Sequence, residues 1–275
     1  MRASTGGGTD ATIRSAAVST ALKRRLYRAV RRARHPRRVV DGLRIREGVV
    51  RFLGGRGVLA GYEREVRASG LMELLLEKGR EHQAAVAAGG GGHSLGAIGY
   101  TEGVYLYAVM RKVRPRVAVE TGVANGFSTA FSLLALQANG HGHLHSIDLP
   151  REVGRAYEPG TFHEGAGRAG IPPGSEPGWL IPPGLKERWT LILGRSQEEL
   201  PPLLGRLGEI DSFMHDSEHS FECMWFEFNE AWPALKQGGV LLSDDVNSTE
   251  AFGRFAAEQG REPVRLARGM ALLQK

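Results

Sequence analysis

Acidic side chains follow two apolar stretches of the chain that each read as a buried β-strand. Asp216 comes directly after residues 210–215, and Asp244 and Asp245 come directly after residues 239–243. Parallel strands end at one edge of a sheet, where such sheets bind ligands, so we expect the three carboxylates to converge. Converging carboxylates repel one another without a cation, and a hard divalent ion such as Mg²⁺ is the natural partner. The alternative is that Asp216 and Asp244 only cap the helices that follow.

A histidine three residues after Asp216 is a candidate for moving a proton. A histidine with an ordinary pKa of ~6.5 can accept a proton at neutral pH. His219 is therefore a candidate base, with Glu218 as a substitute base or an extra metal ligand. The other interpretation is a hydrogen-bonded structural histidine at a helix start. We expect His215 and His163 to be structural or to contact the substrate.

A glycine turn precedes these acids in the chain. A predicted strand over residues 116–120 ends in Glu120, and Gly122 and Gly126 follow before Ser128 opens an apolar helical pattern. Glycine lacks a Cβ and lets a ligand approach the backbone closely, while the first N–H groups of the helix point at that ligand. The charge of Glu120 beside the turn suits a cationic ligand better than a pyrophosphate.

A further acid follows the next predicted strand, where Asp148 comes directly after residues 143–147. An acid at this position can accept hydrogen bonds from ribose hydroxyls. The glycine turn and Asp148 by themselves would also fit a nicotinamide-dependent oxidoreductase.

Strands and helices alternate from residue 116 onward, which predicts an α/β fold with a mostly parallel sheet covered by helices. A Gly- and Pro-rich insertion over residues 149–187 interrupts this pattern, either as a lid or substrate-specificity loop or as a surface excursion. The predicted strands are residues 116–120, 143–147, 189–193, 210–215 and 239–243, the helices are residues 127–138, 197–206 and 220–235, and residues 263–266 and 270–273 form a closing hairpin.

The N-terminal region has a different character. Helical patterns cover residues 11–34, 71–88 and 98–113, whereas residues 40–70 give no clear assignment. A run of four glycines ends at Gly92 and marks a flexible break. We therefore expect a basic helical extension over residues 1–92, of which residues 1–10 are disordered, followed by the sheet domain over residues 93–275.

Positive charge is concentrated in that extension. The 275-residue chain has a net charge of +6, but residues 1–69 hold 17 Lys and Arg against 5 Asp and Glu, a net of +12 that leaves −6 for residues 70–275. The sheet domain thus lacks the basic surface of a nucleic-acid-binding fold. The basic segment is either a solvated helix or arm, or a contact for an acidic partner, a membrane surface or a phosphorylated substrate.

The cysteine content and the apolar runs indicate where the protein resides. Cys223 is the single cysteine, which excludes an intramolecular disulfide and favours a reducing compartment. No apolar run approaches the ~20 residues that span a bilayer, and the start of the chain lacks the apolar core of a secretory signal. We expect a cytoplasmic protein. Its oligomeric state is open, and a homo-oligomer is compatible with the sequence.

Four stretches, residues 119–129, 146–148, 215–221 and 238–245, together resemble class I S-adenosylmethionine-dependent methyltransferases. Within that class they are most similar to the metal-dependent O-methyltransferases that modify sugars of macrolide antibiotics and to the cephalosporin-hydroxylase-like group. The resemblance covers residues 100–273 and implies a Rossmann-like fold with a seven-stranded, mostly parallel sheet and a C-terminal antiparallel hairpin.

The resemblance also implies a role for each candidate residue. It places the methionine end of the cofactor at Glu120, Gly122, Asn125, Gly126 and Ser128, its ribose at Asp148, its adenine near Ser196, the metal at Asp216, Asp244 and Asp245, and the general base at His219, with Asp216 also counted as catalytic. Two positions depart from the family's pattern. Ala124 stands where many members have a glycine, and the last ligand pair is Asp-Asp rather than the Asp-Asn of catechol-type relatives.

The function expected from the resemblance is S-adenosylmethionine-dependent, Mg²⁺-assisted O-methylation of a hydroxylated small molecule, such as a natural-product or glycan sugar. Two alternatives remain besides the oxidoreductase. One is a metal-independent methyltransferase acting on another nucleophile. The other is a non-catalytic adenosyl- or nucleotide-binding protein that docks through its basic N-terminus.

Overall fold

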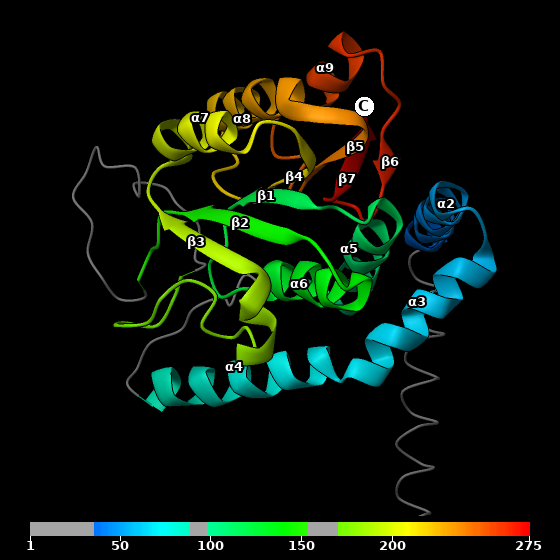
Figure 1. Cartoon of the computed structure of the whole chain (residues 1–275). Helices are drawn as coiled ribbons and strands as arrows, with labels where there is room; N and C mark the ends of the chain where they lie inside the picture. The colour runs from blue at the N-terminus through cyan, green and yellow to red at the C-terminus, as the bar shows by residue number, and fades with distance from the viewer. Residues whose placement is uncertain (1–35, 89–97, 153–169) are drawn as a thin grey trace, which may run out of the picture. The chain divides into compact units, whose positions relative to one another are not determined.

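The computed structural model describes residues 36–88, 98–152 and 170–275 (Figure 1). The chain divides into two compact units, residues 1–46 and residues 47–275, and the second unit contains the whole sheet. None of the helices in the described ranges combines the length and the apolar character that crossing a bilayer requires. The helix predicted over residues 11–34 and the four-glycine break lie outside the described residues.

The centre of the second unit is a seven-stranded sheet with the strand order β3-β2-β1-β4-β5-β7-β6. The first five strands are parallel, whereas β7 runs antiparallel to β5 and β6, so the predicted closing hairpin is confirmed. The strands are β1 (Val117–Thr121), β2 (His143–Asp148), β3 (Trp189–Leu193), β4 (Ile210–His215), β5 (Leu235–Ser243), β6 (Val264–Arg265) and β7 (Ala271–Gln274).

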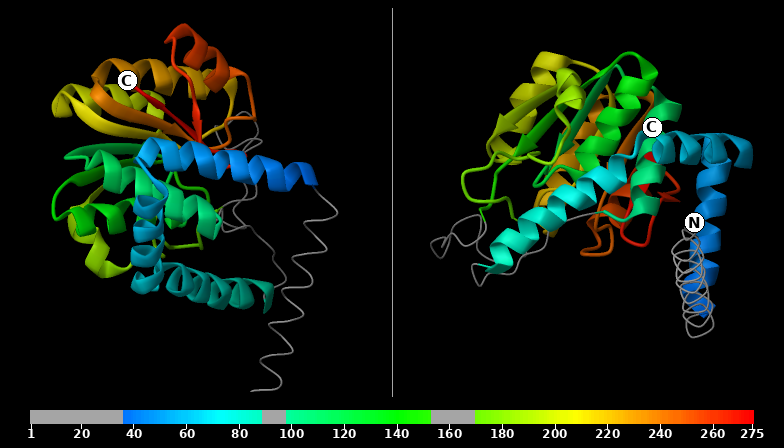
Figure 2. Two further views of the ribbon diagram at one scale, coloured as in Figure 1. Left: turned by 90° about the vertical axis from the view of Figure 1, so that its right-hand side faces the viewer. Right: turned by 90° about the horizontal axis from the view of Figure 1, so that it is seen from below.

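Helices cover both faces of the sheet, with α5 and α6 on one face and α7, α8 and α9 on the other (Figures 1 and 2). Because both faces are covered, the central strands are buried along almost their whole length, and all six residues of β4 are buried, polar ones included. The helices of the described residues are α2 (Pro36–Leu53), α3 (Arg56–Ser69), α4 (Leu71–Ala88), α5 (Tyr100–Val113), α6 (Phe127–Asn139), the 3₁₀ helix η1 (Pro183–Arg188), α7 (Ser196–Leu207), α8 (Phe221–Ala234) and α9 (Ala251–Glu258).

Helices α3 and α4 belong to the same compact unit as the sheet. Glu65 of α3 accepts a hydrogen bond of 2.6 Å from the hydroxyl of Tyr107 on α5 and forms an ion pair with Arg111. Helix α4 has the predicted bounds, and α3 occupies part of the stretch that the sequence left unassigned. The predicted division at residue 92 falls between the described ranges and stays a prediction.

Within the described residues helix α2 runs over Pro36–Leu53, so part of the stretch over residues 40–70 that the sequence left unassigned is helical.

Two further elements differ from the sequence expectation, and both differences have a local cause. Helix α9 was missed because it has only eight residues, includes Gly253, and shows its buried face through just Phe252 and Phe255. Strand β5 begins at Leu235, four residues before the predicted start, and its pairing with β4 contains a register shift that absorbs the extra residues.

The glycine turn after β1 has a left-handed backbone at Gly122 (φ +85°), Ala124 (φ +45°) and Gly126 (φ +90°). Close packing adds a second constraint at Gly122, where a Cβ would lie 1.9 Å from the backbone oxygen of Asp216. Side-chain atoms cannot approach that closely. The absence of a side chain at Gly122 therefore lets the chain after β4 lie directly against the turn after β1.

We predict that Gly122→Ala lowers the free energy of unfolding by more than about 3 kcal/mol, because backbone strain and a steric clash combine there. Gly140→Ala is the matched control. Gly140 also has a positive φ, of +74°, but its missing Cβ would meet nothing within 4 Å. We expect this control to lose only about 1 kcal/mol in urea denaturation. Equal losses in the two variants would show that the close approach to Asp216 is unimportant.

Candidate active site

The carboxyl ends of four adjacent strands, β2, β1, β4 and β5, bring the candidate residues to one edge of the sheet. Backbone hydrogen bonds continue across the strand ends, from Gly122 N to Ile147 O at 2.9 Å, and from Asp216 N to Thr121 O at 2.8 Å. A third such bond runs from Asp244 N to His215 O, at 2.9 Å. The loops that carry the acids therefore leave the sheet from fixed positions.

Glu120 is a buried carboxyl at the end of β1, with only 1% of its surface exposed. Its Oε1 atom accepts a hydrogen bond of 2.6 Å from Ser146 Oγ, which in turn accepts one of 2.7 Å from Trp189 Nε1. Burial raises the pKa of Glu120 to about 7, and the nearby charge of Asp148 adds to this effect. Glu120 therefore gains and loses its proton near neutral pH, and a cation placed beside it would favour the charged form.

Asp148 supplies an acceptor that has no hydrogen-bond partner among the described residues. Its Oδ1 atom lies 3.4 Å from the backbone nitrogen of Val123 in the glycine turn, while its Oδ2 atom is buried and lacks such a partner. Burial raises the pKa of Asp148 to about 6, against the hydrogen bonds from the turn. A buried acceptor without a donor is costly, so this atom fits a ligand hydroxyl. The ribose predicted for this position would supply such a donor.

Asp216, Asp244 and Asp245 influence one another electrostatically. Burial raises the pKa of Asp216 well above its ordinary range, and the charges of Asp244, Glu120 and Asp245 raise it further. Burial also raises the pKa of Asp244. A hydrogen bond from the backbone of Asp245 opposes this increase, and the charge of Asp245 adds to it. In the part of the chain that the structure describes, however, no group of three or more His, Cys, Asp or Glu side chains is arranged to hold a metal ion. The acids repel one another without forming a ready three-ligand cage.

His219 lies in the loop between β4 and α8, where its Nε2 atom is 3.6 Å from Asp245 Oδ2. Burial lowers the pKa of His219, and the neighbouring His215 lowers it further, while Asp245 and Glu227 oppose this change. The ring is therefore neutral at physiological pH and can accept a proton. An imidazolium formed by that transfer would be stabilised by the carboxylate of Asp245.

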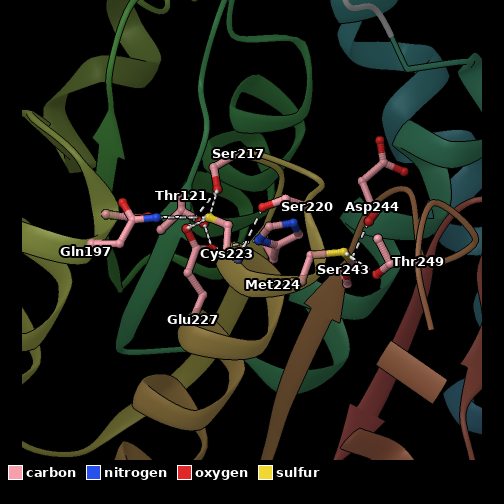
Figure 3. Close-up of polar contacts among 12 residues, drawn as sticks. Thr121, Gln197, Ser217, Ser220, Cys223, Met224, Glu227, Ser243, Asp244 and Thr249 are labelled. Carbon is pink, nitrogen blue, oxygen red and sulfur yellow. Dashed lines mark hydrogen bonds and ion pairs between the residues drawn. The ribbon is translucent and has the colours of Figure 1, made fainter. Parts of the chain in front are cut away.

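Glu227 of α8 is a site residue that the sequence reasoning missed. It is fully buried beneath the loop after β4, together with His215, whose Nδ1 atom lies 2.6 Å from Glu227 Oε2. Burial by itself would raise the pKa of Glu227, but His215 and the surrounding hydroxyl donors hold that pKa below its ordinary value. The available signal was an acid between two phenylalanines, Phe226 and Phe228, on a helix rich in aromatic residues. Figure 3 shows Glu227 among its polar neighbours.

Two predicted cofactor residues make contacts close to this cluster. Ser128 Oγ donates to Asp216 Oδ2 at 3.3 Å, and Ser196 Oγ lies 3.9 Å from Cys223 Sγ. Burial raises the pKa of the Cys223 thiol to about 12, so Cys223 is a protonated packing residue rather than a nucleophile. Both serines thus lie at the predicted edge, and their roles toward a cofactor stay predictions.

Asn125 is hydrogen-bonded to the insertion, and its predicted role toward the cofactor stays a prediction. Its Oδ1 atom accepts a hydrogen bond of 2.5 Å from Trp179 Nε1, and its Nδ2 atom donates one of 3.1 Å to Gly170 O. A Cβ at Gly126 would lie 2.7 Å from the Ile181 side chain. The turn therefore uses Asn125 and Gly126 to pack against residues 170–181.

The described part of the insertion is consequently a packed wall of the site. Gly178 N donates to Ala124 O at 2.8 Å, and the side chains of Leu180 and Ile181 are buried. These contacts argue against a free surface excursion for residues 170–187. Residues 153–169, which include His163, lie outside the described residues.

Comparisons with known proteins can be set beside this geometry. A family model described as a methyltransferase domain matches residues 119–246. A comparison with functionally curated proteins finds no significant match.

Among solved structures, the chain resembles the O-methyltransferase NovP (17% identity, TM-score 0.49), covering 67% of this chain and 83% of that one. It also resembles the O-methyltransferase TomG from Streptomyces achromogenes, which is involved in tomaymycin synthesis and was solved with S-adenosylmethionine (20% identity, TM-score 0.45, 65% and 81% covered). With TM-scores below 0.5, these likenesses add nothing to the argument from the strand order and the site.

The strand order, the antiparallel β7 and the family match define a class I methyltransferase domain, the domain type that uses S-adenosylmethionine as methyl donor. The protein is accordingly an S-adenosylmethionine-dependent methyltransferase, and the resemblance to that class is confirmed. The narrower resemblance to the metal-dependent, sugar-modifying enzymes stays a prediction.

We predict that the apoprotein loses stability as pH rises because of Glu120. The folded-state pKa of about 7 exceeds the ordinary 4.5, so between these values the folded protein binds more protons than the unfolded chain. This stabilisation amounts to at most about 3 kcal/mol. It is complete below about pH 4.5 and is lost as the pH rises through 7.

Urea denaturation at pH 5.5 and pH 8 measures this change, and Glu120→Gln should flatten it. The control is Glu258→Gln, which alters an exposed carboxyl on α9 and should keep the wild-type dependence. Asp148, Asp216 and Asp244 also have raised pKa values and contribute changes of the same sign, so Glu120→Gln should reduce the dependence without abolishing it. An unchanged dependence in that variant would contradict the assignment to Glu120.

Proposed function

We propose that the protein transfers a methyl group to a hydroxyl of a small molecule, such as a natural-product or glycan sugar. The observation that carries the proposal is a neutral, half-buried histidine beside a carboxylate, at the sheet edge where the glycine turn and Asp148 also lie. The choice of a sugar as acceptor depends on the motif resemblance alone. The predicted cytoplasmic location likewise stays a prediction.

S-adenosylmethionine, when bound, supplies a methyl group already activated by a positively charged sulfur. Asp148 Oδ2, the buried acceptor without a partner, would bind a ribose hydroxyl. Glu120 would compensate the positive charge of the methionine end, and its pKa near 7 lets it become charged as that ligand arrives. These two carboxyls orient the ligand through hydrogen bonding and charge, which supplies most of the rate enhancement in such a transfer.

His219 would take the proton of the acceptor hydroxyl on a ring nitrogen. Its lowered pKa keeps the ring unprotonated and ready at neutral pH. Asp245 at 3.6 Å would stabilise the resulting imidazolium. The described part of the insertion forms a wall beside the glycine turn and would help to exclude water.

The donor chemistry of the edge fits a divalent cation, although no three-ligand cage is arranged there within the described residues. Asp216 and Asp244 offer oxygen ligands and would lose their mutual repulsion on binding a cation. Mg²⁺ commonly uses one or two protein carboxylates and completes its shell with water or substrate oxygens. Such an ion would lower the pKa of the acceptor hydroxyl.

A metal-independent methyltransferase is the second candidate. The observation in its favour is the missing three-ligand arrangement together with a histidine that is already a competent base. In that case Asp216 and Asp244 would take up protons, as their raised pKa values allow.

We predict that the purified protein binds S-adenosylmethionine and that Asp148→Ala weakens binding at least about tenfold, because the ligand loses a buried acceptor. Isothermal titration calorimetry measures the affinity, and thermal unfolding checks that the variant is folded. Glu258→Gln, remote on α9, serves as the control with wild-type affinity.

Binding of a nicotinamide dinucleotide instead would select the oxidoreductase. Binding without turnover on any hydroxylated acceptor would select the non-catalytic alternative.

Chelation distinguishes the two methyltransferase mechanisms. We predict that EDTA lowers methyl transfer to hydroxylated sugars by about 100-fold or more, that added Mg²⁺ restores it, and that Asp216→Asn cannot be restored. His219→Asn should be inactive with or without Mg²⁺. Turnover that survives chelation would refute the requirement for a metal ion and select the metal-independent reaction.

A further inference from the structure

A buried acid outside the proposed chemistry organises the loop that carries His219. Glu227 has no exposed surface, and several polar side chains contact its carboxylate, Ser196 among them (Figure 3). Oε2 lies 2.6 Å from His215 Nδ1 and accepts from Thr121 Oγ1 at 2.5 Å, and Oε1 accepts from Ser217 Oγ at 2.7 Å and from Cys223 Sγ at 3.5 Å. A buried carboxylate is tolerated only with such donors.

The contact with His215 fixes that ring. A carboxylate accepts but does not donate hydrogen bonds, so the proton of this pair lies on Nδ1 of His215. The ring also packs edge-on against Phe228, with ring centroids 5.6 Å apart. One short charge-assisted hydrogen bond and one aromatic contact leave the fully buried imidazole a single orientation.

The same ring supports His219. The centroids of the His215 and His219 rings are 5.4 Å apart, at an angle of 78°. The other contact described for the His219 side chain is the 3.6 Å approach of Nε2 to Asp245, whose own side chain is 56% exposed. The His219 Nδ1 atom is buried without a hydrogen-bond partner among the described residues. The rigid surface against His219 is therefore the ring of His215.

Ser217 adds a second connection from Glu227 to the same loop. It lies between His215 and His219 in the sequence and donates to the Oε1 atom, while His215 uses Oε2. One carboxylate thus holds both the ring beneath His219 and the backbone that leads to it.

We propose that Glu227 and His215 are positioning residues for His219: Glu227 orients the ring of His215, and that ring orients His219 toward the acceptor. The inference depends on the proposed role of His219 as the base. Neither Glu227 nor His215 touches the reacting atoms in this scheme. Their effect should therefore appear in the chemical step and in the environment of the His219 ring, and not in cofactor affinity.

Two variants separate positioning from folding. Glu227→Gln keeps the side-chain volume but replaces one acceptor by a donor amide. His215→Asn can still donate to Glu227, so the buried carboxylate stays satisfied, but the ring against His219 is gone. Cys223→Ala is the matched control, because it removes another contact of Glu227 and leaves the His215 pair untouched.

The experiment uses the full chain labelled with ¹⁵N,¹³C-histidine, with the His219 ring resonances assigned through His219→Asn. We expect both variants to shift these resonances in the apoprotein and to lower kcat roughly tenfold or more. The dissociation constant for S-adenosylmethionine should stay within about twofold. Cys223→Ala should match the wild type in all three measurements.

The proposal is overturned if His215→Asn is folded and leaves both the His219 resonances and kcat unchanged, or if Cys223→Ala has the same effects as Glu227→Gln. The resonance shifts are read without cofactor or turnover. A wild type that transfers no methyl group would therefore refute the proposed function, while the relation of Glu227 and His215 to His219 would still be tested.

Discussion

Negative charge buried at one edge of the sheet is the constraint on which the rest of this site depends. Glu120, Asp148, Asp216 and Glu227 all lie where water is largely excluded, and a charged carboxylate there is costly unless it is paired or hydrogen-bonded. The protein meets this cost differently at each position. Glu227 receives internal donors and stays charged, whereas burial raises the pKa of Glu120 to about 7 and that of Asp148 to about 6. The edge therefore favours a ligand that brings positive charge and hydroxyl donors.

The backbone arrangement that gathers these acids is equally demanding. Gly122 allows the loop after β4 to lie against the turn after β1, so Glu120 comes close enough for its charge to raise the pKa of Asp216. The parallel pairing of β1 with β4 and of β4 with β5 then puts Asp244 beside them. The electrostatics of the site thus follow from strand order and from one residue that lacks a side chain.

Sequence reasoning predicted the alternation of strands and helices, because short stretches with apolar β-branched or aliphatic residues alternate with longer amphipathic helical patterns. It also found the acids at the strand ends, since those positions are polar residues directly after apolar runs. It could not find Glu227, because a single acid inside a helix is ordinarily solvent-exposed and only tertiary contacts show it to be buried. The role of Asn125 in holding Trp179 was likewise invisible, since the two are 54 residues apart in the chain. Helix α9 was too short for its periodicity to be recognised.

The attachment of the insertion to the glycine turn has a consequence for how this enzyme can acquire new acceptors. Gly178, Trp179 and Leu180 are hydrogen-bonded to residues 124 and 125, in the turn that precedes helix α6. The described part of the insertion and the glycine turn are therefore mechanically coupled. If the insertion lines the acceptor pocket as proposed, sequence change within residues 178–181 would disturb the donor turn as well. The exposed residues Pro173, Gly174 and Glu176 can vary without breaking these hydrogen bonds.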